Sequence, residues 1–519
     1  MKNINRRGTG IILSYIYTIA NTVIGLFLSA YIIGRIGDIE NGIYQSMTSF
    51  LAYLTVLEFG TGSIMTRNIS LCRKGGEGKI SIIRNASTIW FISLALTGLI
   101  VIAAGVFYCV IPRIYAASMT PQQIDYGKLI FLLMSVRLIF SFLSQALKGC
   151  ILGFERYSVS QIVNLVQLLV RTVLVIGLLL IYRAALTVVL IDFFLQFFLF
   201  LYNLGYCYGK LGIRFQISLF DPQIFRAMTP LALALFLQTI VNTANGNVDK
   251  FVISIMMDPV SVSIYSVGMF VFHMFSSLMT IPISMYMPQI AGDMREGKRD
   301  AALMQTLVEP CRLAALVGGT VLFGFAAVGK PFINVLYGAD YRDAWLIALL
   351  VIAPSYIKMT TGVLVNVLDV LRKRHIRSLC LTGSTLANIV LTVWWVSSGK
   401  MIGAALATLV ATLIGDVIVM NLYYTNAIKI NIPVLLRKSY HGILLSLILS
   451  GIIAYLVSGL FEHQILALLI GGASFLVTEW IALLIFGLSQ EEKQAVWRIL
   501  NRLKQRFSPT REKDSLHGG

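Results

Sequence analysis

Five basic residues lie inside long apolar segments of the sequence, where a charge is costly. An ionised group at the centre of a bilayer rarely faces lipid and commonly marks a transport pathway. Guanidinium and ammonium groups bind dense anions through strong, charge-assisted hydrogen bonds. We therefore regard four of them as candidate ligands for an anionic group. The five residues are Arg137, Arg171, Lys250, Arg312 and Lys358, and Arg312 is set apart because it has a nearby carboxylate.

Carboxylates in the same apolar segments give the cations alternative partners. Glu309 and Arg312 lie three residues apart on a predicted helix and can pair on one face, so we expect a structural pair there. Asp249, next to Lys250, and Asp416 are candidate ion-coupling carboxylates. Each other cation could equally satisfy a backbone carbonyl or a nearby carboxylate, and the residue pattern leaves both interpretations open.

The composition of the chain is typical of a membrane protein. Of 519 residues, 57% are hydrophobic and 13% are charged, whereas soluble domains carry about 25% charged residues. A helix needs about 20 apolar residues to cross the hydrocarbon. We therefore predict an all-α polytopic membrane protein of about fourteen spans. The predicted spans are 10–34, 43–65, 87–111, 128–152, 158–182, 184–208, 226–256, 259–290, 302–328, 343–369, 377–398, 401–424, 440–460 and 464–487.

The distribution of basic residues predicts the orientation in the membrane. With the N-terminus inside, the inside segments contain 30 of the 42 Lys and Arg residues and the outside loops contain 7. This excess follows the positive-inside rule, so we expect a multi-pass protein of the inner (cytoplasmic) membrane with both termini in the cytoplasm. The net charge of +18 then reflects topology and contact with anionic headgroups, and we predict no nucleic-acid partner.

A weak internal repeat at an offset of 221 residues divides the spans into two sets. Its matches are Ile19–Thr22 with Ile240–Thr243, Tyr44 with Tyr265, and Arg137 with Lys358. We predict two pseudo-symmetric six-helix lobes related by an axis along the membrane normal, with the substrate site between them. The predicted domains are an N-lobe over 1–210, a C-lobe over 211–430, two C-terminal helices over 431–488 and a basic cytoplasmic tail over 489–519, in which Gln490–Phe507 is predicted to lie on the inner leaflet.

Patterns for catalysis or metal binding are missing from the sequence. The six cysteines and five histidines are scattered, which predicts no metal site and no cofactor. The outside loops are too short for a soluble catalytic domain, and the motifs of zinc proteases, serine hydrolases and dinucleotide-binding enzymes do not occur. We therefore predict a transporter and not an enzyme.

Four stretches of the sequence resemble the polysaccharide transporter branch of the MOP superfamily, which includes the Wzx-type oligosaccharide flippases. They are Phe59–Gly62 with Arg67, Leu152–Tyr157, Asn245–Ile253 and Leu336–Ala344, and the resemblance extends over roughly residues 5–490. It implies a flippase that moves undecaprenyl-diphosphate-linked oligosaccharide from the cytoplasmic to the outer leaflet for cell-surface polysaccharide synthesis. It also implies two lobes around a cationic cavity, and a groove for the lipid tail formed by the last two helices.

The candidate residues suit such a substrate. Arg and Lys are natural partners of a diphosphate, and asparagine amides can bind sugar hydroxyls. Rocking of the two lobes would alternate access to the site. The expected partners are the lipid-linked oligosaccharide, membrane lipids, and a polysaccharide polymerase and glycosyltransferases of the same synthesis. The predicted substrate-binding residues are Arg137, Arg171, Lys250, Lys358, Asn21, Asn242 and Asn245.

Two other classes of protein compete with this interpretation. A cation-coupled drug antiporter of the MATE type shares the superfamily, but it usually has twelve spans and relies on buried carboxylates. A membrane polysaccharide polymerase or glycosyltransferase typically carries a long outside loop, which the sequence does not provide.

Overall fold

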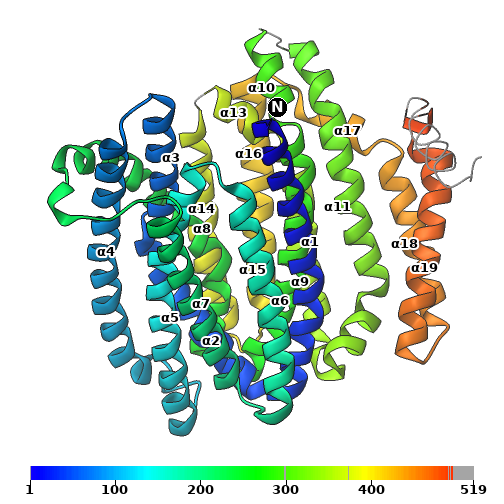
Figure 1. Ribbon diagram of the computed structural model, residues 1–519. Helices are drawn as coiled ribbons and strands as arrows, with labels where there is room; N and C mark the ends of the chain where they lie inside the picture. Colours follow the sequence, from blue (N-terminus) through cyan, green and yellow to red (C-terminus); the bar gives the residue numbers. More distant parts are fainter. Residues whose placement is uncertain (1, 297–299, 372, 489, 491, 495–519) are drawn as a thin grey trace, which may run out of the picture. The chain divides into compact units, whose positions relative to one another are not determined.

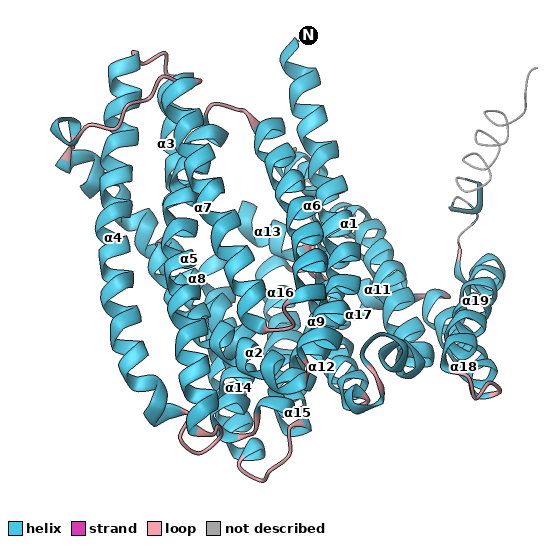
Figure 2. Ribbon diagram, turned by 60° about the horizontal axis from the view of Figure 1, so that its bottom comes forward, coloured by secondary structure: helices cyan, strands magenta, loops and turns pink. Residues whose placement is uncertain are grey.

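The computed structural model describes residues 2–296, 300–371, 373–488, 490 and 492–494, and in this part of the chain every regular element is helical (Figures 1 and 2). The prediction of an all-α polytopic membrane protein is confirmed. Most of the predicted amphipathic tail, Gln490–Phe507, lies outside the described residues.

The helices follow one another with short connections (Figure 2). Their bounds are α1 Lys2–Ile36, α2 Asp38–Ala52, η1 Tyr53–Glu58, α3 Thr61–Lys74, α4 Lys79–Ile114, α5 Pro121–Gly153, α6 Tyr157–Ile181, α7 Ala185–Gly209, η2 Ile217–Leu219, α8 Pro222–Met256, α9 Pro259–Met285, α10 Met287–Arg295, α11 Asp300–Tyr337, η3 Ala339–Tyr341, α12 Asp343–Thr360, α13 Leu364–Val370, α14 Arg374–Val396, α15 Ile402–Ala411, η4 Thr412–Val419, α16 Met420–Ile428, α17 Ile432–Tyr440, α18 Ile443–Gly459, α19 Gln464–Ala482 and η5 Leu483–Gly487.

Twelve helices of the described chain are long and apolar enough to cross a membrane, and a thirteenth span results if the bent pair α17 and α18 is counted as one. The predicted span 43–65 accounts for the remaining difference between thirteen spans and the fourteen that we predicted. There the chain forms α2, η1 and α3, of 15, 6 and 14 residues, instead of one straight helix. Phe59 and Gly60 between η1 and α3 have φ values of 50° and 64°, and a left-handed residue ends a right-handed helix.

The helix boundaries support the internal repeat. α8, α9 and α11 begin 220, 221 and 221 residues after α1, α2 and α4. The repeat therefore extends beyond the few matching residues to the starts of three pairs of helices. The division into lobes at residues 210 and 430 concerns symmetry and motion, and it stays a prediction.

By their internal contacts, the described residues form two compact units. The first unit contains 2–274, 336–351 and 375–416. Within it α3, α4 and α5 lie side by side (Figure 1). A Cβ atom on Gly149 of α5 would lie 2.3 Å from the carbonyl oxygen of Gly62 in α3, so only glycine permits this close packing. Phe50 of α2 stacks on Phe251 of α8 with ring centroids 5.7 Å apart, which joins α8 to the same core.

The second unit contains 275–335, 352–374 and the described residues from 417 onward. Its C-terminal helices α18 and α19 form a hairpin that packs on α11 through Leu447 and Phe475. Glu479 of α19 accepts a hydrogen bond from Thr320 of α11, so this carboxylate is buried and partnered between the two helices.

Candidate functional site

Two of the predicted cations of the first unit differ in their partners. Arg171 of α6 forms a bidentate ion pair with Asp192 of α7, with Nε–Oδ1 and Nη2–Oδ2 distances of 2.6 and 3.2 Å. Arg137 of α5 is half-buried, and its buried Nε has no hydrogen-bond partner among the described residues. Arg171 is therefore neutralised by a carboxylate, whereas Arg137 keeps a buried donor that is not used.

Tyr44 of α2 locates these groups in one region of the unit. Its hydroxyl lies within electrostatic reach of Asp192, Arg171 and Arg137. Helices α2, α5, α6 and α7 therefore together place two guanidinium groups and one carboxylate around one tyrosine. The formal charge of this cluster is +1, and its binding of an anion stays a prediction.

A second polar cluster of the same unit surrounds Asp249 of α8, which is 6% exposed. Its carboxylate accepts hydrogen bonds from the Tyr265 hydroxyl at 2.9 Å, the Asn388 amide at 3.1 Å and the Thr392 hydroxyl at 2.9 Å, and from the Thr408 hydroxyl. All four donors are neutral. Buried charge is commonly neutralised by a cation, and in the described chain this carboxylate has only hydroxyl and amide partners.

Lys250 follows Asp249 on α8 but does not pair with it. Adjacent helical residues point about 100° apart, and Lys250 forms no hydrogen bond or ion pair with the described residues. Its charge reaches His273 of α9. Lys250 is half-buried and resembles Arg137 in having an uncompensated positive charge.

The predicted asparagines differ in exposure. Asn21 of α1 and Asn242 of α8 are exposed, and Asn245, one turn further along α8, is half-buried. The described contacts do not join them to Arg137 or to the Asp249 cluster. Their role in binding sugar stays a prediction.

The remaining candidate cation, Lys358, lies near the end of α12 in the second unit and is half-buried. The structure describes this unit separately from the first. The predicted correspondence of Lys358 with Arg137 across a shared site therefore stays a prediction. Asp416 is buried in the π-helical segment η4, and its part in ion coupling also stays a prediction.

The predicted pairing of Glu309 with Arg312 is wrong. Arg312 forms an ion pair with Glu492, with Nε–Oε1 at 2.7 Å, and donates to the carbonyl of His441 at 3.0 Å. Glu309 is exposed and accepts a hydrogen bond from the Tyr286 hydroxyl at 3.1 Å. Helical spacing permits the local pair, but the long arginine side chain reaches a carboxylate and several carbonyl groups at the ends of other helices, which satisfy more of its donors.

A chain of hydrogen bonds that we did not predict joins the start of α2 to the start of α9. The Asn41 amide donates to Ser263 at 2.7 Å, the Ser263 and Tyr341 hydroxyls lie 2.7 Å apart, and the Tyr341 hydroxyl donates to Asp38 at 2.7 Å. Asn41, Ser263 and Tyr341 are each at most 2% exposed. We call Asp38, Asn41, Ser263 and Tyr341 the α2–α9 contact.

Close packing accompanies the α2–α9 contact. A Cβ atom on Gly42 would lie 1.8 Å from the carbonyl oxygen of Pro259, so the two helix starts meet at a glycine. Tyr341 belongs to Leu336–Ala344, a stretch that the sequence singles out, but its partners lie 78 and 303 residues away. Short-range spacing therefore contained no signal for this contact. For the Asp249 cluster, the sequence singled out Asp249 itself and matched Tyr265 with Tyr44, but it did not indicate the other donors, Asn388, Thr392 and Thr408.

Comparison with known proteins places this geometry in a family. No curated protein matches the sequence significantly. Among solved structures, the chain is similar to the lipid II flippase MurJ in its inward closed conformation, with a TM-score of 0.74, 15% identity, and coverage of 91% of this chain and 98% of that one.

Two drug transporters share the fold less closely. An inward-facing multidrug resistance MATE family transporter matches with a TM-score of 0.59, 11% identity, and coverage of 80% of this chain and 98% of that one. The MATE multidrug transporter DinF-BH in complex with R6G matches with a TM-score of 0.52, 15% identity, and coverage of 81% and 93%. Residues 40–346, more than half of the chain, match the family described as "Polysaccharide biosynthesis protein", and the chain belongs to that family.

Proposed function

We propose that this protein is a flippase that moves an undecaprenyl-diphosphate-linked oligosaccharide from the cytoplasmic to the outer leaflet of the inner membrane. The family membership and the fold shared with a lipid II flippase support the substrate class. The diphosphate binds to cationic side chains inside the membrane, the sugar hydroxyls bind to amides, and the polyprenyl tail stays in lipid.

The observation that carries the proposal is the uncompensated positive charge within the spans. Among the described residues, the buried Nε of Arg137 has no hydrogen-bond partner and Lys250 forms no ion pair. A structural cation inside a bilayer would be neutralised, as Arg171 is by Asp192. Cations without a compensating carboxylate are instead suited to the reversible binding of an anionic ligand.

Alternating access requires contacts that break and form again, and the α2–α9 contact is suited to that role. It joins a helix of the predicted N-lobe to one of the predicted C-lobe at loops that the charge pattern places outside. Its hydrogen bonds involve neutral groups and one carboxylate, so their net contribution in water is modest. In this proposal the contact closes the outer side and opens to release the substrate.

The Asp249 cluster supports coupling of transport to a small cation. Carboxylate, hydroxyl and amide oxygens are the ligands that hard cations prefer, and the cluster holds oxygens of Asp249, Thr392, Thr408 and Asn388. Sodium and proton gradients are the two candidates. Sodium-dependent translocation in vesicles at fixed pH, lost in Asp249→Asn, would separate them.

The proposal is tested with purified protein in proteoliposomes that contain a fluorescent polyprenyl-diphosphate glycan. Each of Arg137→Glu, Lys250→Glu and Lys358→Glu is expected to reduce translocation by about 10- to 100-fold, because a charge-assisted hydrogen bond contributes roughly 1.5–3 kcal/mol. Arg183→Glu and Lys400→Glu, in predicted outside loops, serve as matched charge reversals that keep activity.

Three outcomes would contradict the proposal. If the three core reversals leave translocation unchanged, the cationic site does not exist. If the protein instead exports drugs against a cation gradient, it is a MATE-type antiporter. If cells that lack the protein change the length of their polymer without accumulating the inner-leaflet intermediate, it acts as a polymerase.

A further inference from the structure

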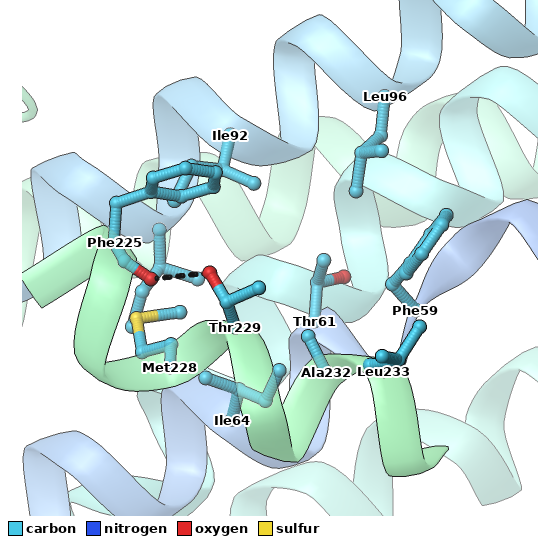
Figure 3. Close-up of a pocket in the computed structure, with 11 residues that line it drawn as sticks. Phe59, Thr61, Ile64, Ile92, Leu96, Phe225, Met228, Thr229, Ala232 and Leu233 are labelled. Carbon is cyan, nitrogen blue, oxygen red and sulfur yellow. Dashed lines mark hydrogen bonds between the residues drawn. The ribbon is translucent and has the colours of Figure 1, made fainter. Parts of the chain in front are cut away.

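An apolar cavity of about 210 Å³ lies in the first unit among α3, α4 and α8 (Figure 3). Ile64 of α3 and Ile92 and Leu96 of α4 line the cavity (Figure 3). Helix α8 contributes Phe225, Met228, Thr229, Ala232 and Leu233 to the same wall. Its position differs from that of the Arg137 and Asp249 clusters, and none of their residues lines it.

The cavity is suited to a hydrocarbon chain. The hydroxyl of Thr229 donates to the carbonyl of Phe225 at 2.9 Å and is therefore already satisfied (Figure 3). An apolar cavity of about 150 Å³ stays dry and admits a small hydrocarbon, and this one is larger. Phe225 and Leu233 are 47% and 52% exposed, so the cavity can be reached from the surrounding lipid.

One polar side chain of the cavity wall lacks a partner in the described chain. Thr61, at the start of α3, is 3% exposed, and its buried hydroxyl has no hydrogen-bond partner among the described residues. An unpaired buried hydroxyl costs free energy, and a ligand oxygen would remove that cost. The occupant is therefore expected to be a hydrocarbon chain that carries an oxygen near one end.

A polar pocket of about 270 Å³ adjoins the apolar cavity, and Met228 lines both. It contains Arg67, which is exposed and forms no ion pair with the described residues. Asn68 and Asn85 add amide groups, and Glu77, the carboxylate of this pocket, accepts a hydrogen bond from Ser81. Arg67 lies six residues after Thr61, about 9 Å along the helix axis.

We propose that the two pockets together bind one anionic membrane phospholipid. Its acyl chain fills the apolar cavity, an ester oxygen accepts a hydrogen bond from Thr61, and its phosphate binds to Arg67. A polyprenyl diphosphate has a phosphoester oxygen but no acyl-ester carbonyl to accept from Thr61, which distinguishes this lipid from the transported substrate. Because α3 and α4 belong to the predicted N-lobe and α8 to the predicted C-lobe, the bound lipid favours the conformation in which these helices pack together.

The test counts lipids that stay bound to the full-length protein, purified in detergent and supplied with phosphatidylglycerol, by native mass spectrometry. The wild-type protein should retain one phosphatidylglycerol in preference to phosphatidylcholine. Arg67→Gln should weaken retention by about tenfold, as expected for loss of one charge-assisted hydrogen bond. Ala232→Trp should abolish it by filling the cavity.

Matched variants separate the site from general effects. Arg156→Gln removes an exposed arginine outside both pockets, and Ala234→Trp places the same bulk on α8 outside the cavity, so both should retain the lipid. Thr61→Val, which keeps the shape, should weaken retention without unfolding the protein, as checked by size-exclusion chromatography. Equal retention by all variants, equal retention of phosphatidylcholine, or capture of a polyprenyl diphosphate in place of phospholipid would each overturn the proposal.

Discussion

The α2–α9 contact makes the sharpest prediction about transport. Tyr341→Phe removes the hydroxyl that bonds both Asp38 and Ser263, and it changes nothing else in the side chain. The bond to the carboxylate contributes about 1.5–3 kcal/mol and the neutral bond about 0.5–1.5 kcal/mol. Asp38 is only half-buried and regains water when the bond is lost, so the net effect is smaller than the sum.

We therefore expect Tyr341→Phe to destabilise the closed outer side by about 1–3 kcal/mol, a shift of roughly 5- to 150-fold toward the outward-open state. Spin labels at the exposed positions Asp125, in a loop predicted outside, and Ser398, at the outer end of the predicted span 377–398, would report this shift as a longer distance in double electron–electron resonance. Ser263→Ala should act in the same direction, because it interrupts the same chain of hydrogen bonds.

Tyr182→Phe provides the control, since Tyr182 is 65% exposed at a predicted outside loop. It should leave the distance distribution unchanged. The reasoning fails if Tyr341→Phe also leaves the distribution and the translocation rate unchanged while the protein remains folded. In that case the contact would not be part of the outer closure.

Three further predictions concern stability and reactivity. Asp249→Asn should lower the free energy of unfolding by about 1–3 kcal/mol, measured by thermal denaturation in detergent, because hydroxyl donors lose their carboxylate acceptor; an unchanged transition would mean that water enters the cluster. Gly149→Ala should destabilise by about 1–3 kcal/mol because its Cβ would clash with the Gly62 carbonyl, whereas Gly105→Ala, which has no neighbour within 4 Å, should be neutral or stabilising. Burial raises the pKa of the Cys72 thiol to about 11, so the thiol stays protonated at pH 8. It should therefore react with iodoacetamide far more slowly than a free thiol. Rapid alkylation, detected by mass spectrometry, would show that the thiol is accessible.

The topology predicted from charge is consistent with the contacts of the first unit. Three connections predicted outside, before α2, before α9 and at η3, meet at the α2–α9 contact. Two connections predicted inside also meet, because Arg84 near the start of α4 lies 3.9 Å from Asp221, which precedes α8. The topology prediction sums hydropathy and charge over many residues, so an error in the boundary of a single helix does not change it.

The partners of the charged side chains within the membrane could not be predicted in the same way. The donors to Asp249 on α14 and α15 lie 139, 143 and 159 residues away in the sequence. Arg312 finds Glu492, 180 residues away, instead of the carboxylate three residues before it. Local spacing shows which side chains can meet on one helix. It does not show which donors, acceptors and charges the neighbouring helices place beside them.

The sequence by itself therefore determined the membrane class, the helix order, the repeat and the presence of ionisable groups within the spans, because each depends on local composition and periodicity. Only the tertiary structure decided which charges are compensated. It separated the paired Arg171 from Arg137, surrounded Asp249 with neutral donors, and split the expected second span at Phe59 and Gly60. The physical reason is that the cost of a buried charge depends on the groups within a few ångströms of it, and the packing of helices from distant parts of the chain places those groups there.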